Sequence, residues 1–177
     1  MVVEAHSTST LINGPVVVLV DTSSRQYRGR LMDGLDRLHV RPDEVDVVVS
    51  THLHPDHVGN HDLFPRARKL ARREERPGDG YEVITADIEL APGIALLHTP
   101  GHTRGSMSVI VDAGGARYVI AGDALPTRDN HDRWVPPGVN YDPAVALDSM
   151  RRIVSAADVI IPGHGAPFEV SRDERKA

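Results

Sequence analysis

Short apolar runs alternate along the chain with segments in which apolar residues recur every three or four positions. The runs Val16–Val20 and Val45–Thr51 are typical of strands that are buried on both faces. The apolar spacing within Leu31–Leu38 predicts a helix, and Ser23 or Ser24 is placed to cap its start. This alternation predicts an α/β protein without an internal linker.

Turn signals set the expected bounds of these elements. Asn13–Gly14 predicts a tight hairpin between two apolar strands, and Gly114–Gly115 predicts another within the strand-rich stretch Tyr81–Ala121. Asp142–Pro143 is typical of a helix start, because the carboxylate can cap free amides and proline suits the first turn. That helix is expected to reach about Ala156.

Length and composition favour one domain formed by residues 1–177, because 177 residues can enclose one sizeable core. The last strand is expected within residues 158–165, and the charged tail at 171–177 is expected to be mobile. A net charge of −5 argues against a protein that coats polyanions. The basic segment Arg66–Arg76 could still steer an anion, although a solvated face is the more frequent role of such a run.

The cellular setting is constrained by what the sequence lacks. No apolar run is long enough to cross a bilayer, and the first residues have neither the basic nor the apolar part of an export signal. The chain has no cysteine, which removes disulfides and is compatible with a reducing compartment. We therefore expect a cytoplasmic protein with no membrane partner.

Seven side chains that suit a divalent metal follow the predicted strand ends. Four lie in the motif THLHPDH, and the other three each follow an apolar strand that runs into a glycine-flanked turn. They are His52, His54, Asp56, His57, His102, Asp123 and His164. Imidazole and carboxylate are preferred by borderline divalent metals. A lone histidine in a turn is usually structural, but this many candidates at strand ends predicts a metal centre.

Five histidines and two aspartates divide naturally into two sites, with Asp123 as the expected bridge. One site would use His52, His54 and His102, and the other Asp56, His57 and His164. Three protein ligands leave an open position, which is typical of catalytic sites. Two ions roughly 3.5–4 Å apart can share a hydroxide that acts as nucleophile. Asp56 is interpreted first as a ligand and second as a base, so Asp56 and Asp123 are the candidate catalytic residues.

These motifs resemble a known family. In their order, THLHPDH, TPGH, AGD and PGHG are similar to the motifs of the metallo-β-lactamase superfamily, and VDTSS at Asp21 resembles the Asp-Thr motif that precedes them there. The resemblance covers nearly the whole chain, from Thr8 to Val170. THLHPDHVGNHDLFP and IIPGHGAPFEV look most like metallo-β-lactamase domain-containing protein 1 and similar hydrolases.

The resemblance implies a four-layer αββα sandwich. Only about seven residues precede TSTLI, so the first sheet is expected to be short or completed by a neighbouring chain. An exposed strand edge favours pairing, which makes a homodimer a reasonable hypothesis.

The resemblance also implies a hydrolase with two divalent metals, zinc by default and manganese or iron as alternatives. The bond could be an RNA phosphodiester, an ester, a thioester or a lactone, so the choice between a nucleic-acid and a small-molecule substrate stays open. The alternative is a persulfide dioxygenase, in which one iron would be held by His52, His54, His102 and Asp123. Ligand identity alone does not fix the metal.

Other residues have weaker claims to the site. Asp21 and Thr51 are expected to orient metal ligands by hydrogen bonds, or else to cap strand ends. His131 and Trp134 lie in the long, proline-rich stretch Leu125–Tyr141 that follows Asp123. Such a loop can form a substrate wall, and the indole could instead pin the loop to the core.

Overall fold

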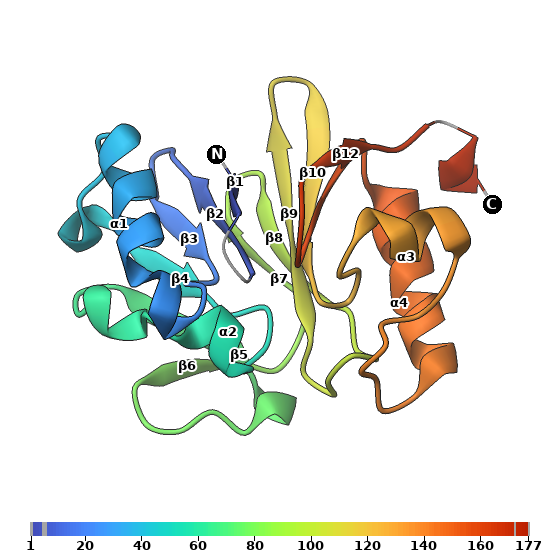
Figure 1. The fold of residues 1–177 in the computed structure, drawn as a ribbon, viewed down its shortest axis with the longest axis horizontal. Coiled ribbons are helices and arrows are strands. Elements are labelled where there is room, and N and C mark those ends of the chain that lie inside the picture. The colour runs from blue at the N-terminus through green and yellow to red at the C-terminus, as the bar shows by residue number, and fades with distance from the viewer. Residues whose placement is uncertain (1, 5–6, 172, 177) are drawn as a thin grey trace.

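The chain folds into four layers, with two sheets packed face to face and helices on the outer side of each (Figure 1). The structure is a computed structural model that describes residues 2–4, 7–171 and 173–176. Helices α1 (Arg28–Arg37) and α2 (Pro55–Val58) lie on one outer side, and α3 (Arg128–Arg133) and α4 (Pro143–Ala156) lie on the other. The expected αββα sandwich is confirmed.

The first sheet has the strand order β1-β2-β3-β4-β5-β6. Its strands are β1 (Val2–Glu4), β2 (Thr8–Ile12), β3 (Val18–Val20), β4 (Val47–Val49), β5 (Arg68–Arg72) and β6 (Tyr81–Ile84). The pairs β1–β2 and β2–β3 are antiparallel, and β3 to β6 run parallel. The expected shortening of this sheet is not seen, because the three residues of β1 add an edge strand to β2.

The second sheet has the order β12-β11-β10-β9-β8-β7. Its strands are β7 (Ile88–Ala91), β8 (Ile94–His98), β9 (Met107–Ala113), β10 (Ala116–Gly122), β11 (Val159–Pro162) and β12 (Phe168–Glu169). Strand β10 pairs antiparallel with β9 and parallel with β11. The prediction that the last strand lies within residues 158–165 was wrong, because β12 returns to pair with β11.

Local signals decided some elements and misled at others. The hairpin at Gly114–Gly115 is confirmed, since Ala113 pairs with Ala116 and both glycines have positive φ. The predicted tight turn at Asn13–Gly14 is wrong, because β3 begins only at Val18 and leaves a longer connection.

The predicted helices are both present. Helix α4 starts as expected, with the Asp142 carboxylate accepting from the amides of Ala144 and Val145. Ser24 precedes the short 3-10 helix η1 (Arg25–Tyr27), which leads into α1, but its side chain makes no capping hydrogen bond. Four more 3-10 segments are η2 (Pro42–Glu44), η3 (His61–Leu63), η4 (Arg73–Glu75) and η5 (Glu174–Lys176).

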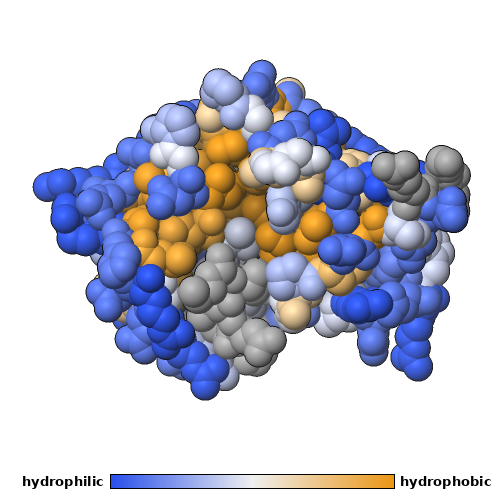
Figure 2. Space-filling model, turned by 90° about the horizontal axis from the view of Figure 1, so that it is seen from above, coloured by the Kyte–Doolittle hydropathy of each residue, from blue (hydrophilic) through white to orange (hydrophobic). Residues whose placement is uncertain are grey.

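Three apolar clusters fill the spaces between the layers. The largest lies between the sheets and includes Val49 and Val109, while α1 packs over the first sheet through Leu31 and α4 packs over the second through Ile153. Seen from above, apolar side chains gather at the centre of the face and hydrophilic ones surround them (Figure 2). The sheets thus form a rigid support for the loops at the strand ends.

Arg175 forms an ion pair with Asp158, so part of the tail contacts the fold, and its expected mobility stays a prediction. Within the described ranges, no helix is long and apolar enough to cross a membrane. The homodimer and the cytoplasmic location also stay predictions.

Candidate metal centre

The seven predicted ligands meet where strands of both sheets end. Strand β4 leads to the THLHPDH motif, of which α2 carries the last two ligands, while β8, β10 and β11 lead to the remaining three. Their potential ligand atoms fall into three groups, each with all atoms within 4.8 Å of one another. The groups are His52, His54 and His102; His52, His57 and Asp123; and Asp56, His57 and His164.

The group of His52, His54 and His102, which we call the first group, is made of three imidazole rings. Nε2 of His102 lies 3.0 Å from Nδ1 of His54. The ring of His52 is centred 4.6 Å from that of His54 and 4.7 Å from that of His102, nearly perpendicular to both. His52 and His102 are buried, while His54 is partly exposed. Three imidazoles turned edge-on toward a common point are suited to hold one divalent metal.

The group of Asp56, His57 and His164, which we call the second group, combines one carboxylate with two imidazoles. Oδ2 of Asp56 lies 3.8 Å from Nε2 of His57 and 3.9 Å from Nε2 of His164. His57 is fully buried, but the other two side chains are about 30% exposed. The second group therefore has an open side toward solvent.

Asp123 lies between the two groups. Its Oδ1 is 3.4 Å from Nε2 of His57 and 3.1 Å from Nε2 of His164. Its Oδ2 is 3.6 Å from Nε2 of His102. Oδ2 also lies 3.3 Å from Nε2 of His164. The carboxylate thus has both oxygens near the second group and one of them also near the first, a placement that is compatible with a bridging ligand.

Three atoms at the centre show that the donor set suits a metal. Nε2 of His52, Nε2 of His57 and Oδ1 of Asp123 are buried and have no hydrogen-bond partner in the described part of the chain. An unsatisfied buried polar atom costs roughly 1–3 kcal/mol. Three such atoms from one ligand set are explained together if divalent metals are their partners.

Asp21 fixes the orientation of a ring in each group. Its Oδ2 lies 2.7 Å from Nδ1 of His57 and also accepts from Thr51 Oγ1 at 2.7 Å. Because that hydroxyl proton is used, Thr51 Oγ1 can accept from Nδ1 of His52 at 3.1 Å. With Nδ1 of each ring engaged, Nε2 is the nitrogen left for a metal, and in His57 the metal would have to replace a proton there. Asp21 and Thr51 thus lie where the sequence placed them, and their role stays a prediction.

Charge at the centre follows from burial and from the two carboxylates. Burial lowers the pKa of His52 and of His102, so both rings favour the neutral form that binds metals. For His57 burial also opposes charge, but Asp21 and Asp123 outweigh it and raise its pKa to about 10. Burial disfavours the charged form of Asp123 too, yet the neighbouring rings of His164 and His57 hold its pKa below the usual range.

The chain is similar in sequence to a known protein family. Residues 3–82 and 69–164 match the model of the metallo-beta-lactamase superfamily. The chain belongs to this superfamily. It is 36% identical over 173 residues to metallo-beta-lactamase domain-containing protein 1 of Mus musculus, covering 94% of this chain and 65% of that protein. The chain therefore spans about two thirds of that relative's length.

The chain is also similar to an archaeal protein and to a solved structure. A probable metallo-hydrolase of Methanocaldococcus jannaschii is 36% identical over 148 residues, covering 83% of this chain and 70% of its own. The structure of an N-acyl homoserine lactone hydrolase with N-hexanoyl-L-homoserine at its catalytic metal centre has a TM-score of 0.76 at 25% identity. It covers 89% of this chain and 80% of its own.

Glu75 supports the candidate site, and the sequence analysis did not identify it. Its Oε2 accepts from the amide of Leu53, between His52 and His54, at 3.0 Å. Its Oε1 accepts from the amide of Gly105 at 2.9 Å and from Thr103 Oγ1 at 2.5 Å. Glu75 therefore ties together the two loops that carry the first group. In the sequence it is only one of two acids in a basic run, which gave no signal.

Half of the six cations in the basic run form ion pairs. The run forms β5 and η4, and its arginines Arg66, Arg68 and Arg72 pair with Asp43, Glu82 and Glu74. Most of these pairs are exposed, so they add little stability, but they reduce the positive field available to an anion. The anion-steering role of Arg66–Arg76 stays a prediction with little support from these contacts.

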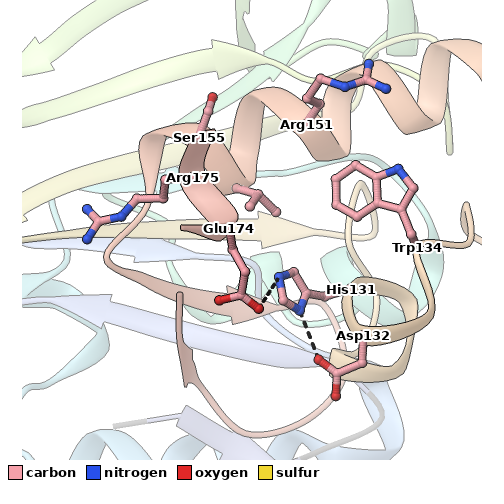
Figure 3. A pocket seen from close by; sticks show the side chains of 8 residues that line it. His131, Asp132, Trp134, Arg151, Ser155, Glu174 and Arg175 are labelled. Carbon is pink, nitrogen blue, oxygen red and sulfur yellow. Dashed lines mark hydrogen bonds and ion pairs between the residues drawn. The ribbon is translucent and has the colours of Figure 1, made fainter. Parts of the chain in front are cut away.

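His131 and Trp134 lie in a pocket apart from the metal ligands. They line a cavity of about 360 Å³ with residues of α4 and the tail, and none of the seven ligands is among its described lining residues. His131 is buried between Asp132, 2.9 Å from its Nδ1, and Glu174, 3.8 Å from its Nε2 (Figure 3). His131 thus links α3 to the tail. The alternative in which the indole of Trp134 pins the loop to the core stays a prediction, and that side chain is 40% exposed. A substrate role for either residue stays a prediction.

Proposed function

We propose that the chain is a metal-dependent hydrolase with two divalent metals, in which Asp123 is the bridging ligand. The observation that carries this proposal is the position of the Asp123 carboxylate, whose Oδ1 faces the second group and whose Oδ2 lies near both groups. The buried, unpartnered atoms of His52 and His57 support it. Membership of the metallo-beta-lactamase superfamily supports the reaction class.

Each part of the site has a separate task in this proposal. Two bound divalent metals supply a hydroxide near neutral pH and polarise the substrate oxygen. Asp123 stays ionised because His164 and His57 stabilise its charge. The partly exposed His54, Asp56 and His164 mark the side from which substrate enters. Asp56 serves as a ligand there, and its exposed carboxylate is also placed to orient a nucleophile.

The bond hydrolysed is an ester, a thioester or a lactone in our proposal, with an RNA phosphodiester as the alternative. The lactone hydrolase is similar in fold and in sequence, and its structure holds its product at the metal centre. Zinc is the expected metal, because imidazole and carboxylate ligands suit it, and manganese or iron would suit them too.

The mononuclear iron alternative uses only part of this site. An iron held by His52, His54, His102 and Asp123 would leave the second group without a task. Yet that group is complete, and His57 in it is oriented by a hydrogen bond to Asp21. A complete second group favours paired metals over a single iron.

The test begins with metal content in protein purified without added metal. We expect two zinc ions per chain, loss of hydrolysis after chelation and its return on addition of zinc. Asp123→Ala should lose the paired metals and most turnover while keeping its circular dichroism, and Asp33→Ala on α1 is the matched control. One iron per chain, with oxygen uptake on glutathione persulfide, would overturn the hydrolase in favour of a dioxygenase.

A further inference from the structure

The exposed apolar side chains of this protein gather in one segment. Among the described residues, five large hydrophobic side chains are exposed, and four of them lie in Trp134–Tyr141. Val139 is the most exposed of these at 67%, and Tyr141 is 41% exposed. Single apolar side chains on a surface are ordinary, but several in one short segment mark a place where something apolar binds.

This segment, which we call the apolar segment (residues 134–141), adjoins the first ligand group. The carbonyl of Val139 accepts a hydrogen bond from Nδ1 of His102 at 2.7 Å. The amide of Tyr141 donates to the carbonyl of Gly101 at 2.9 Å, beside the same ligand. The end of the segment with Val139 and Tyr141 is therefore fixed to the loop that presents a metal ligand.

The apolar segment is held in shape by contacts with neighbouring residues. The side-chain amide of Asn130 donates to the carbonyls of Val135 and Pro136, both at 3.2 Å. The guanidinium of Arg104, in the neighbouring loop, lies over the ring of Tyr141, 4.6 Å from its centre. This cation–π contact holds the tyrosine in place. A surface that is already ordered costs little conformational entropy when it binds a ligand.

We propose that Val139 and Tyr141 form a wall of the substrate site and receive the alkyl chain of an acyl substrate. This inference rests on the proposed hydrolase and narrows its substrate to an ester, thioester or lactone with an apolar acyl group. A phosphodiester would present charge at each unit, whereas the wall beside His102 offers valine and tyrosine, and three of the six cations of Arg66–Arg76 are already paired with acids.

The experiment compares acyl chain lengths on the zinc-loaded protein. Values of kcat/KM are measured for acetyl, butanoyl, hexanoyl and octanoyl esters and for the matching homoserine lactones. Full burial of a methylene corresponds to about fourfold, so we expect about a two- to fourfold rise per methylene until the wall is covered. Val139→Ser should flatten this rise, with a loss on octanoyl substrates about tenfold larger than on acetyl ones.

The matched control is Val83→Ser, because Val83 is the fifth exposed large hydrophobic residue among those described and lies on β6, 46% exposed. It should leave the chain-length dependence unchanged, with equal metal content in both variants. Equal slopes in the two variants would overturn the wall. Loss of a dimer in Val139→Ser, seen by light scattering with no change in slope, would overturn it too and assign the segment to self-association.

The remaining outcomes separate this inference from the proposed function. Cleavage of single-stranded RNA without hydrolysis of any acyl substrate would overturn the inference and leave the hydrolase standing. If the zinc-loaded protein hydrolyses none of these substrates, the hydrolase and the inference fall together. A chain-length dependence that Val139→Ser removes and Val83→Ser keeps supports both.

Discussion

Single side chains around the metal centre have tasks that can be measured separately. Asp21 contacts His57 directly and reaches His52 through Thr51, so it serves one ring in each ligand group. Its backbone has a positive φ of 57°, a conformation that aspartate adopts more readily than most residues. The carboxylate can therefore point to both partners from the end of β3.

We predict that Asp21→Ala weakens metal binding at both sites by roughly 10- to 100-fold, because both rings lose their fixed orientation. Competition with a chromophoric chelator measures the two affinities. Thr51→Val should affect mainly the site that contains His52, since it leaves the contact between His57 and Asp21 intact. Unchanged affinities in Asp21→Ala would show that packing alone orients the rings.

Gly163 leaves space for the carboxylate of Asp123. A Cβ at this position would lie 2.0 Å from Oδ1 of Asp123, far inside contact distance. We predict that Gly163→Ala displaces the carboxylate, so that the second metal and most turnover are lost. Metal analysis and kcat are the measurements. Gly29→Ala is the matched control, since nothing lies within 4 Å of its added Cβ, and equal metal content in both would contradict the prediction.

Between elements, the decisive contacts join loops that are far apart in the sequence. Glu75, at the end of η4, binds the loop after β4 and the loop after β8 through one carboxylate. Glu75 thus links the loop of His52 and His54 to the loop of His102. Gly105 packs against it, where a Cβ would lie 2.6 Å from its Cγ.

We predict that Glu75→Ala lowers the free energy of unfolding by about 1–3 kcal/mol for each buried donor left without a partner. It should also weaken metal binding at the first group more than at the second. Urea unfolding and chelator competition measure the two effects. Glu75→Gln, which keeps one strong acceptor oxygen, should restore part of both. Glu74→Ala is the control, and an equal effect there would exclude a specific tie.

The stability of the whole protein should depend on pH through His61. Burial, and to a lesser extent Lys69, lower the pKa of this ring from 6.5 to about 4, so the folded state keeps it neutral. In the unfolded chain the His61 ring binds a proton more readily than in the folded state. The contribution of His61 to the free energy of unfolding is therefore complete above pH 6.5. It is lost progressively as the pH falls from about 6.5 to 4.

We predict that this loss reaches about 2 kcal/mol at pH 5, from the linkage of the two pKa values. The measurement is the difference in unfolding free energy between the wild type and His61→Asn at pH 8 and at pH 5, with the same metal present. Taking the difference cancels the titration of the metal ligands. A difference that does not change with pH would show that His61 is not neutral in the folded state.

The sequence by itself determined the elements whose signals are local. Two adjacent glycines were enough for the β9–β10 hairpin, because only such residues readily adopt its positive φ angles. Asp142 before Pro143 was enough for the start of α4, because the cap needs no distant partner. The seven ligands could also be named, since their residue types and their positions after apolar strands are visible in the chain.

Only the tertiary structure decided how distant segments combine. It placed Asp123 between two groups that come from both sheets, and Glu75 across two loops, because packing sets these distances and sequence spacing does not. It also separated Trp134, which lines the pocket of His131, from Val139 at the metal centre, although both lie in one loop. A pattern along the chain records local preference, whereas a site depends on contacts that exist only after the sheets have packed.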